Sequence, residues 1–266
     1  MSQFLRDEYL KNLNLDDKAL TKIKEDLDAI ADRANKNLSP TNEEEFKKKY
    51  LIASYIIRFD NKGFRLYDFN KVLKYFEDAH RIERVIFVLE TGQALLSNRL
   101  TGDSIEIRFD AKDANNCILL VQSDDDNWVD SNFLKLKERI SRYKNRNFII
   151  RNRWTPIIIQ LSGVTFGFLV SLWLAIKISP KLQIDNSLAF AFVIAFLIFS
   201  NLWTFILVAI GRCLDFYWPN VSFRRIEGIH WLIKALISTA LISTFLYLLN
   251  RIFFQIVNML KSLWKG

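Results

Sequence analysis

Cysteine, histidine, glycine and proline are all scarce in this 266-residue chain, and the shortages exclude several classes of protein. Cys117 and Cys213 alone cannot form the disulfide framework of a small secreted domain. The two histidines, His80 and His230, lie far apart and outside any HExxH pattern, so we predict no metal site and no cofactor. Eight glycines and four prolines are too few for extended low-complexity disorder.

Signatures of the common enzyme classes are also missing. The chain has no GxGxxG dinucleotide-binding loop, no GxxxxGK[ST] phosphate-binding loop and no GxSxG nucleophile motif. The acidic cluster at residues 124–126 and Asp130 could hold a hard cation, but it lacks the glycine and the terminal glutamate of a calcium loop. A solvated turn with a helix cap is the favoured interpretation. We therefore predict no catalytic residues and no enzymatic activity.

Charge is divided unevenly along the chain. The first 153 residues hold 28 Lys and Arg against 26 Asp and Glu, whereas the last 113 residues hold 9 against 3. The second part contains long uncharged apolar runs, which exclude a wholly soluble protein. We therefore predict a charged soluble part followed by a membrane part.

Three apolar runs are long enough to cross a bilayer, at about residues 156–178, 189–210 and 229–249. Backbone groups within lipid must be paired internally, so these runs are expected to be helices. None of them contains Asp or Glu, which argues against a proton relay or a coupled transporter. The sequence therefore predicts a transmembrane domain at residues 151–266.

Flanking cations indicate the orientation of these spans. Segments that would lie inside carry 9 Lys and Arg and those outside carry 5, and the N-terminus has no apolar leader. We expect a cytoplasmic N-terminal domain and an external C-terminus. The aromatic segment 214–223, followed by Arg224 and Arg225, is expected at the inner headgroup level. The tail at 251–265 either extends the third helix, lies along the outer surface or re-enters the membrane.

Small and polar residues recur on the faces of the spans. Gly163, Gly167 and Ser171 form a stripe that favours close helix packing. The residues that could line a water-filled pore are Asn201, Thr204, Ser200, Ser238, Thr239 and Ser243. Packing within or between subunits is the plainer explanation of these polar residues, and a pore at the centre of an oligomer is the alternative.

The N-terminal part alternates between helix-like and strand-like patterns. Apolar spacing predicts helices at 3–13, 18–37, 69–81 and 132–143, and strands at 51–59, 64–67, 84–90, 95–100, 104–109 and 117–122. Residues 40–45 are expected to form a loop, and Asp130 or Ser131 to cap the last helix. The predicted fold is an α+β cytosolic domain, with two helices (1–40) and then ββαβββα (41–150), followed by an all-α domain of three transmembrane helices.

Arginines gather on the polar side of the predicted hairpins. Arg58 and Arg108 alternate with apolar residues, and Arg65 and Arg99 lie on neighbouring arms. Such a group could bind the phosphates of a small ligand, and a charged exterior matched by nearby acids is the alternative. The near-neutral balance of the first 153 residues argues against general nucleic-acid binding.

Three segments, IIRFDNKGFRLYDF, SIEIRFD and SDDDNWVDSNFLKLKERI, precede the three apolar runs. With this layout the chain resembles bacterial membrane effectors of anti-phage defence, and most of all the membrane subunit of Hailong-type systems. The resemblance implies a homo-oligomeric pore in the bacterial inner membrane. It also implies a cytosolic domain that responds to a nucleotide or oligonucleotide made by a partner nucleotidyltransferase. No individual residue is carried over by this resemblance.

Two hypotheses follow from the sequence. The first is a membrane effector that forms a ligand-gated, homo-oligomeric channel, with a tetramer favoured because three helices alone cannot enclose a pore. The second is a non-enzymatic, membrane-anchored scaffold that recruits a cytosolic partner through the hairpin face. Ion flux distinguishes them, because a scaffold gives no conductance.

Overall fold

The computed structural model describes residues 3–38 and 43–223, together with isolated positions between 236 and 258. The chain divides into two compact units. The N-terminal unit comprises residues 1–149 and 219–225, and the helical unit comprises residues 150–218 and 226–266. Most of the predicted third span at 229–249, and most of the tail at 251–265, lie outside the described residues.

The N-terminal unit is built on one antiparallel sheet of six strands in the order β1-β7-β6-β5-β3-β4. Its strands are β1 (Phe4–Tyr9), β3 (Leu51–Phe59), β4 (Lys62–Leu66), β5 (Ile82–Thr91), β6 (Ser104–Asp110) and β7 (Ile118–Ser123). The centrally placed β5 is buried along almost its whole length, as its run of apolar residues requires. An α+β region with one antiparallel sheet is therefore confirmed.

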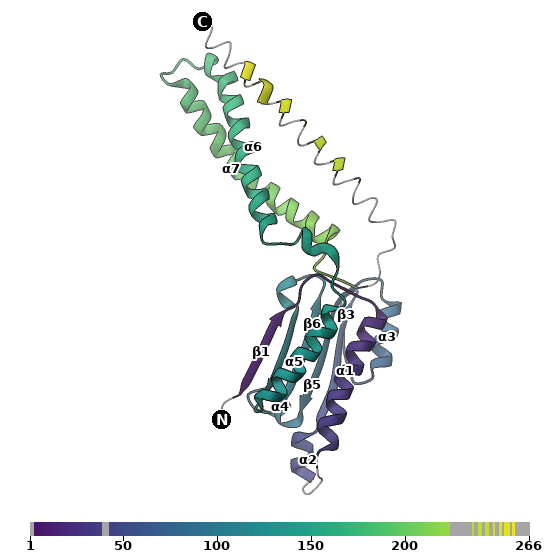
Figure 1. Cartoon of the computed structure of the whole chain (residues 1–266). Coiled ribbons are helices and arrows are strands. Elements are labelled where there is room, and N and C mark those ends of the chain that lie inside the picture. The colour runs from purple at the N-terminus through teal and green to yellow at the C-terminus, as the bar shows by residue number, and fades with distance from the viewer. Residues whose placement is uncertain are drawn as a thin grey trace. The chain divides into compact units, whose positions relative to one another are not determined.

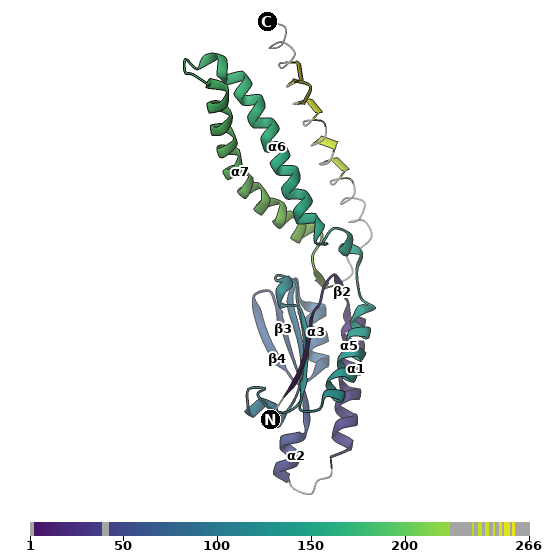
Figure 2. The same cartoon turned by 60° about the vertical axis from the view of Figure 1, so that its left-hand side comes forward.

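Three helices cover one face of this sheet. They are α1 (Asp17–Lys36), α3 (Phe69–Asp78) and α5 (Asp126–Ser141). Figure 1 shows α1 and α5 lying side by side across the sheet, and Figure 2 shows the same layer more nearly edge-on. Between the layers lies an apolar core that includes Phe87, Phe109, Ile107, Leu27 and Phe133. Burial of this core is the main force that holds the layers together.

Short helices complete the N-terminal unit. They are α2 (Glu43–Lys49), α4 (Gly92–Leu96) and the single turns η1 (Ala114–Asn116) and η2 (Arg146–Ile149). The helix α2 packs closely against α4, since a Cβ atom on Gly92 would lie 2.3 Å from the carbonyl oxygen of Lys47. Only glycine fits at this contact.

A buried carboxylate links α1 to α5. Asp26 on α1 is 7% exposed, and its carboxylate accepts hydrogen bonds from Arg139 Nε at 2.5 Å and forms an ion pair with Lys135 Nζ at 3.3 Å. Burial alone would raise the pKa of Asp26, but the hydrogen bonds and charges of Arg139 and Lys135 outweigh it and lower this pKa. The charged form of Asp26 therefore stabilises the contact between the two helices.

The predicted helix at residues 3–13 is wrong. The chain forms β1 there and then β2 (Leu13–Leu15). Residues of β1 pair in register with β7, from Phe4 opposite Ser123 to Tyr9 opposite Ile118. Pairing with a strand more than a hundred residues away satisfies the backbone and overrides the local helical spacing.

Three further local predictions are wrong. Residues 95–100 do not form a strand, because α4 ends at Leu96 and Asn98 and Arg99 take left-handed backbone angles. Residues 43–45 of the predicted loop at 40–45 belong instead to α2, which begins at Glu43, and residues 40–42 lie outside the described residues. The last helix starts at Asp126 and is capped by Asp125, whose Oδ1 accepts a hydrogen bond from Asn127 N at 3.0 Å.

The helical unit contains two long apolar helices, α6 (Trp154–Ile178) and α7 (Ser187–Tyr217), joined through the turn η3 (Ser179–Lys181). Asn152 caps α6, since its Oδ1 accepts hydrogen bonds from Trp154 N and Thr155 N at 2.8 and 2.9 Å. Both helices are long and apolar enough to cross a membrane, and little of their surface is buried. Among the described residues the structure therefore has two candidate spans, where the sequence predicts three.

The segment 214–223 is not an interfacial stretch along its whole length. Helix α7 continues to Tyr217, and Val221–Phe223 then form a strand, β8, which pairs in parallel with β2. The Val221 side chain is fully buried, and the ring of Phe223 packs edge-on against Phe76 at 6.1 Å. After α7 the chain thus returns to the N-terminal unit.

Replacing Asp26 with asparagine should destabilise the N-terminal unit by about 2 kcal/mol, since it removes a charged acceptor facing two cations. Because the native pKa of Asp26 lies below its ordinary value of 3.8, this stabilisation is present above that pH and is lost as the pH falls through the lowered pKa. Thermal melting of the detergent-solubilised chain should show the difference at neutral pH and a smaller one below about pH 4.

Asp28→Asn is the matched control, because Asp28 lies on the same helix and forms a more exposed pair with Lys24. We expect it to change stability by less than about 0.5 kcal/mol. Equal losses in the two variants, or a gap that does not narrow in acid, would contradict the role given to Asp26.

Candidate functional site

The predicted ligand-binding arginines lie on or beside the face of the sheet opposite α1 and α5. Arg99 donates a hydrogen bond to Glu90 at 3.1 Å, and Arg99 and Arg108 both bind the carboxylate of Glu106. Burial would raise the pKa of Glu106, but the two arginines outweigh it and hold this pKa below its usual range. These two guanidinium groups are therefore already neutralised by carboxylates of the same chain.

The other two predicted arginines are separate from this cluster. Arg58 Nε donates to Glu83 Oε2 at 2.9 Å. Arg65, on the edge strand β4, has no ion pair among the described residues. It lines a small cavity of about 70 Å³ together with Tyr67 and Glu90. The four arginines thus do not form one phosphate-binding group, and their assignment as ligand-binding residues stays a prediction.

The acidic cluster near residue 125 has structural partners. Asp125 caps α5, and Asp130 forms an ion pair with Arg6 at 2.5 Å. The guanidinium of Arg6 also lies over the ring of Phe133, 4.5 Å from its centre. These contacts fasten the edge strand β1 to α5.

Four asparagines join the segments of the N-terminal unit that lead into α6 and out of α7. We call Asn12, Asn145, Asn147 and Asn220 the asparagine junction. On the side that leads to α6, Asn145 N donates to Asn12 O at 2.6 Å, and Asn145 Nδ2 donates to Leu13 O at 3.1 Å. Asn12 adopts a left-handed backbone with φ of 59°, which asparagine tolerates better than most residues.

The segment that follows α7 is held at the same junction. Asn12 N donates to Asn220 Oδ1 at 3.0 Å, and Asn220 Nδ2 donates to Leu10 O at 3.3 Å. Asn147 Nδ2 donates to Pro219 O at 2.9 Å, which joins the two segments directly. Both ends of the α6–α7 hairpin are therefore flanked by chain that is anchored at one hydrogen-bonded junction.

The helical unit has its own link between the two ends of the hairpin. Arg151, just before α6, forms an ion pair with Asp215 at 2.5 Å and donates to the carbonyl oxygen of Trp218. The Arg151 side chain is 20% exposed and that of Asp215 is 74% exposed, so the carboxylate side of this ion pair is open to solvent in the single chain. Within this unit, the start of α6 and the end of α7 are thereby held together.

The predicted small-residue stripe of α6 lies against α7. Gly163, Gly167 and Ser171 are all buried. A Cβ atom at Gly163 would lie 1.8 Å from the Trp203 ring, and one at Gly167 would lie 2.2 Å from the Phe199 ring. Two large rings of α7 thus occupy the space that the glycines of α6 leave open.

The predicted pore residues of α7 point away from this contact. Ser200, Asn201 and Thr204 are all exposed in the single chain, and Asn201 Nδ2 donates to Leu197 O of its own helix at 3.0 Å. Of the residues predicted in the third span, Thr239 and Ser243 are also exposed, and Ser238 lies outside the described residues. The structure therefore brings the three polar residues of α7 to one exposed stretch of the helix.

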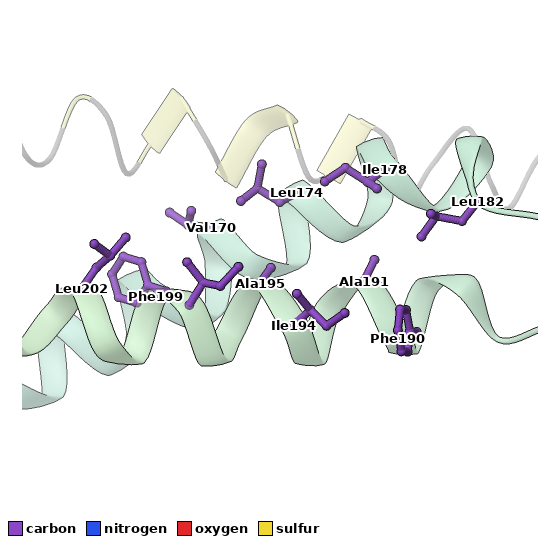
Figure 3. Close-up of a pocket in the computed structure, with 11 residues that line it drawn as sticks. Val170, Leu174, Ile178, Leu182, Phe190, Ala191, Ile194, Ala195, Phe199 and Leu202 are labelled. Carbon is purple, nitrogen blue, oxygen red and sulfur yellow. The ribbon is translucent and has the colours of Figure 1, made fainter. Parts of the chain in front are cut away.

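An apolar groove of about 400 Å³ runs along α6 and α7. Figure 3 shows its lining, which includes Val170, Leu174 and Ile178 from α6 and Ile194 and Phe199 from α7. All of its lining side chains are apolar, so it offers no hydrogen-bonding group to orient a polar ligand. The groove suits hydrocarbon or another apolar helix.

Sequence reasoning missed the asparagine junction. Asparagines in loops are common turn residues, and nothing in their spacing indicates that Asn12, Asn145 and Asn220 converge. The positive φ of Asn12 could not be deduced without the structure. The one sequence signal was the short interval between the last helix of the N-terminal part and the first apolar run.

Gly167→Leu should separate α6 from α7, because its side chain would enter the space of the Phe199 ring. We expect the melting temperature of the helical unit in mild detergent to fall by several degrees. Gly211→Leu is the matched control, since a Cβ atom at Gly211 meets nothing within 4 Å. Equal melting of the two variants would show that the stripe does not support the hairpin.

Asn220→Leu should loosen the asparagine junction, because it leaves the partly buried N–H of Asn12 without its acceptor. The expected cost is about 1–3 kcal/mol. In hydrogen–deuterium exchange of the full chain, peptides covering residues 10–15 and 219–223 should exchange faster, while β6 keeps its protection. Ser222→Ala, which removes only a partly buried bond to Asn14, is the control. Unchanged exchange in Asn220→Leu would rule out a stabilising junction.

Comparison with known proteins assigns no family to the chain. No protein-family model matches the sequence, and the searches of curated proteins and of solved structures found no match either.

Proposed function

We propose that this protein is a membrane effector that forms a homo-oligomeric, ligand-gated ion channel, with a tetramer favoured. In this proposal the N-terminal unit faces the bacterial cytoplasm and senses a nucleotide-type ligand, and the C-terminus lies outside. Opening of the channel depolarises the inner membrane as part of anti-phage defence. The chain performs no catalysis and needs no cofactor.

The asparagine junction is the observation that carries this proposal. A receptor can drive its membrane helices only if the two states of the sensing domain make different contacts with them. Here the segments flanking both ends of the α6–α7 hairpin bond to one another through Asn12, Asn147 and Asn220. A shift in this junction would move both ends of the hairpin together, which a single flexible linker would not do.

The exposed polar residues of α7 support the channel part of the proposal. An amide such as Asn201 is costly to leave facing lipid, even though one bond is satisfied within its helix. Because Ser200, Asn201 and Thr204 face away from α6, another helix or another subunit must cover them in a membrane. A ring of such residues around an oligomer axis would supply hydrogen bonds to water.

The ligand class and the biological setting are proposed from the resemblance of the sequence to anti-phage membrane effectors. A nucleotide or oligonucleotide from a partner nucleotidyltransferase is the expected signal.

A membrane-anchored scaffold is the second candidate function. The edge strand β4 favours it, because its outer side pairs with no described strand and its residues are mostly exposed. A partner could add a strand there, beside the exposed side chains of Phe64 and Tyr67. A scaffold would recruit its partner without conducting ions.

Purified protein in planar bilayers should conduct ions, and Asn201→Leu should lower the conductance several-fold, because apolar side chains favour dewetting of a pore. The oligomer should persist when its mass is measured in mild detergent. Thr165→Val is the matched control, since Thr165 is an exposed polar residue of α6 whose hydroxyl bonds to its own helix.

If Asn201→Leu conducts normally, the Asn201 side chain does not line the pore and serves only in helix packing. A monodisperse monomer that conducts no ions would remove the channel hypothesis and leave the scaffold.

A further inference from the structure

A cavity of about 310 Å³ lies in the N-terminal unit next to the asparagine junction. Its walls come from the end of β1, the link from β1 to β2, the last turn of α5 and the segment that follows it. The volume is at the lower end of the range for small-molecule sites. Asn12 and Asn145 belong both to the cavity wall and to the junction.

The charge of this cavity is positive. Lys11, Lys137 and Lys144 line it, against the single carboxylate of Glu8. Glu8 pairs with Lys137 at 2.5 Å, whereas Lys11 and Lys144 have no ion pair among the described residues. Two ammonium groups are thus available to an anion, and lysine is a common ligand of phosphate. They also offset the negative end of the α5 dipole.

Flat apolar surfaces and a buried acceptor accompany these charges. Tyr9 and Phe148 both line the cavity and are each 57% exposed, so their ring faces are open to a ligand. The Oδ1 atom of Asn12 is buried and accepts no hydrogen bond from the described residues. A buried acceptor without a donor is uncommon in proteins.

We infer that this cavity binds a small phosphorylated ligand that carries a flat ring. Lys11 and Lys144 would hold the phosphate, and Tyr9 or Phe148 would stack on the ring. This inference rests on the proposed function, since it names the place where the controlling ligand binds. Bound ligand would restrain Asn12 and Asn145, and through them the junction that flanks the α6–α7 hairpin.

The phosphate could also belong to an anionic lipid headgroup, so the test separates the two sources. The full chain is placed in phosphatidylcholine nanodiscs, which carry no net charge, and titrated with the four ribonucleoside 5′-monophosphates. Inorganic phosphate and a water-soluble short-chain phosphatidylglycerol are titrated in parallel. The variants are Lys11→Gln/Lys144→Gln and Tyr9→Ala. Lys71→Gln removes an exposed lysine of α3 and is the control.

At least one monophosphate should bind, and the Lys11→Gln/Lys144→Gln variant should weaken its binding tenfold or more, with Lys71→Gln within twofold of the wild type. Tyr9→Ala should weaken the monophosphate more than inorganic phosphate, since only the former carries a ring. Both lysines are exposed, so the double variant should keep the wild-type melting temperature, which is measured alongside.

Equal monophosphate affinity in the wild type and the double variant would overturn the inference. Lysine-dependent binding of the short-chain lipid alone would overturn it too, as would no binding of any monophosphate. Conductance is recorded separately. Lysine-dependent binding without conductance would support the cavity and overturn the channel, whereas conductance without such binding would overturn the cavity alone.

Discussion

The parallel pairing of β2 with β8 is the interaction on which the organisation of this chain depends. Leu13, Leu15 and Val221 are fully buried around it, although about 200 residues separate the two strands. Closing so long a loop adds little entropy cost beyond that of a loop half as long, so the burial of these side chains can offset it. Because of this pairing, the α6–α7 hairpin is an insertion within the N-terminal unit and not an appendage at its end.

The six-stranded sheet makes a different kind of contact on each of its two faces. On one face, apolar side chains of the strands pack beneath α1 and α5. On the other face, arginine side chains form ion pairs with Glu90 and Glu106, so these charges are neutralised within the same chain. Arg108 Nε is buried without a hydrogen-bond partner among the described residues, so this network is only partly satisfied. Lys11 and Lys144, which form no ion pair among the described residues, lie instead beside the junction.

The elements that could be predicted from the sequence are those whose own apolar spacing determines their structure. The apolar run of β5 and the alternation of β3 indicated strands, and the spacing in α1 indicated a helix, because each element buries its own apolar face. Strands β1 and β8 could not be predicted, since each is defined by a partner distant in the sequence. The carboxylates that neutralise Arg99 and the asparagines that converge on Asn12 were hidden for the same reason.

The return of the chain into β8 also sets the order in which the protein can be completed during synthesis. Val221–Phe223 emerge from the ribosome only after both long apolar helices have been made. Until then Leu13, Leu15 and Phe76 lack the strand that covers them, so the N-terminal unit is an unfinished domain with apolar surface exposed. Synthesis of the hairpin therefore precedes completion of the N-terminal unit, and a chain cut before residue 219 would leave this apolar surface permanently uncovered.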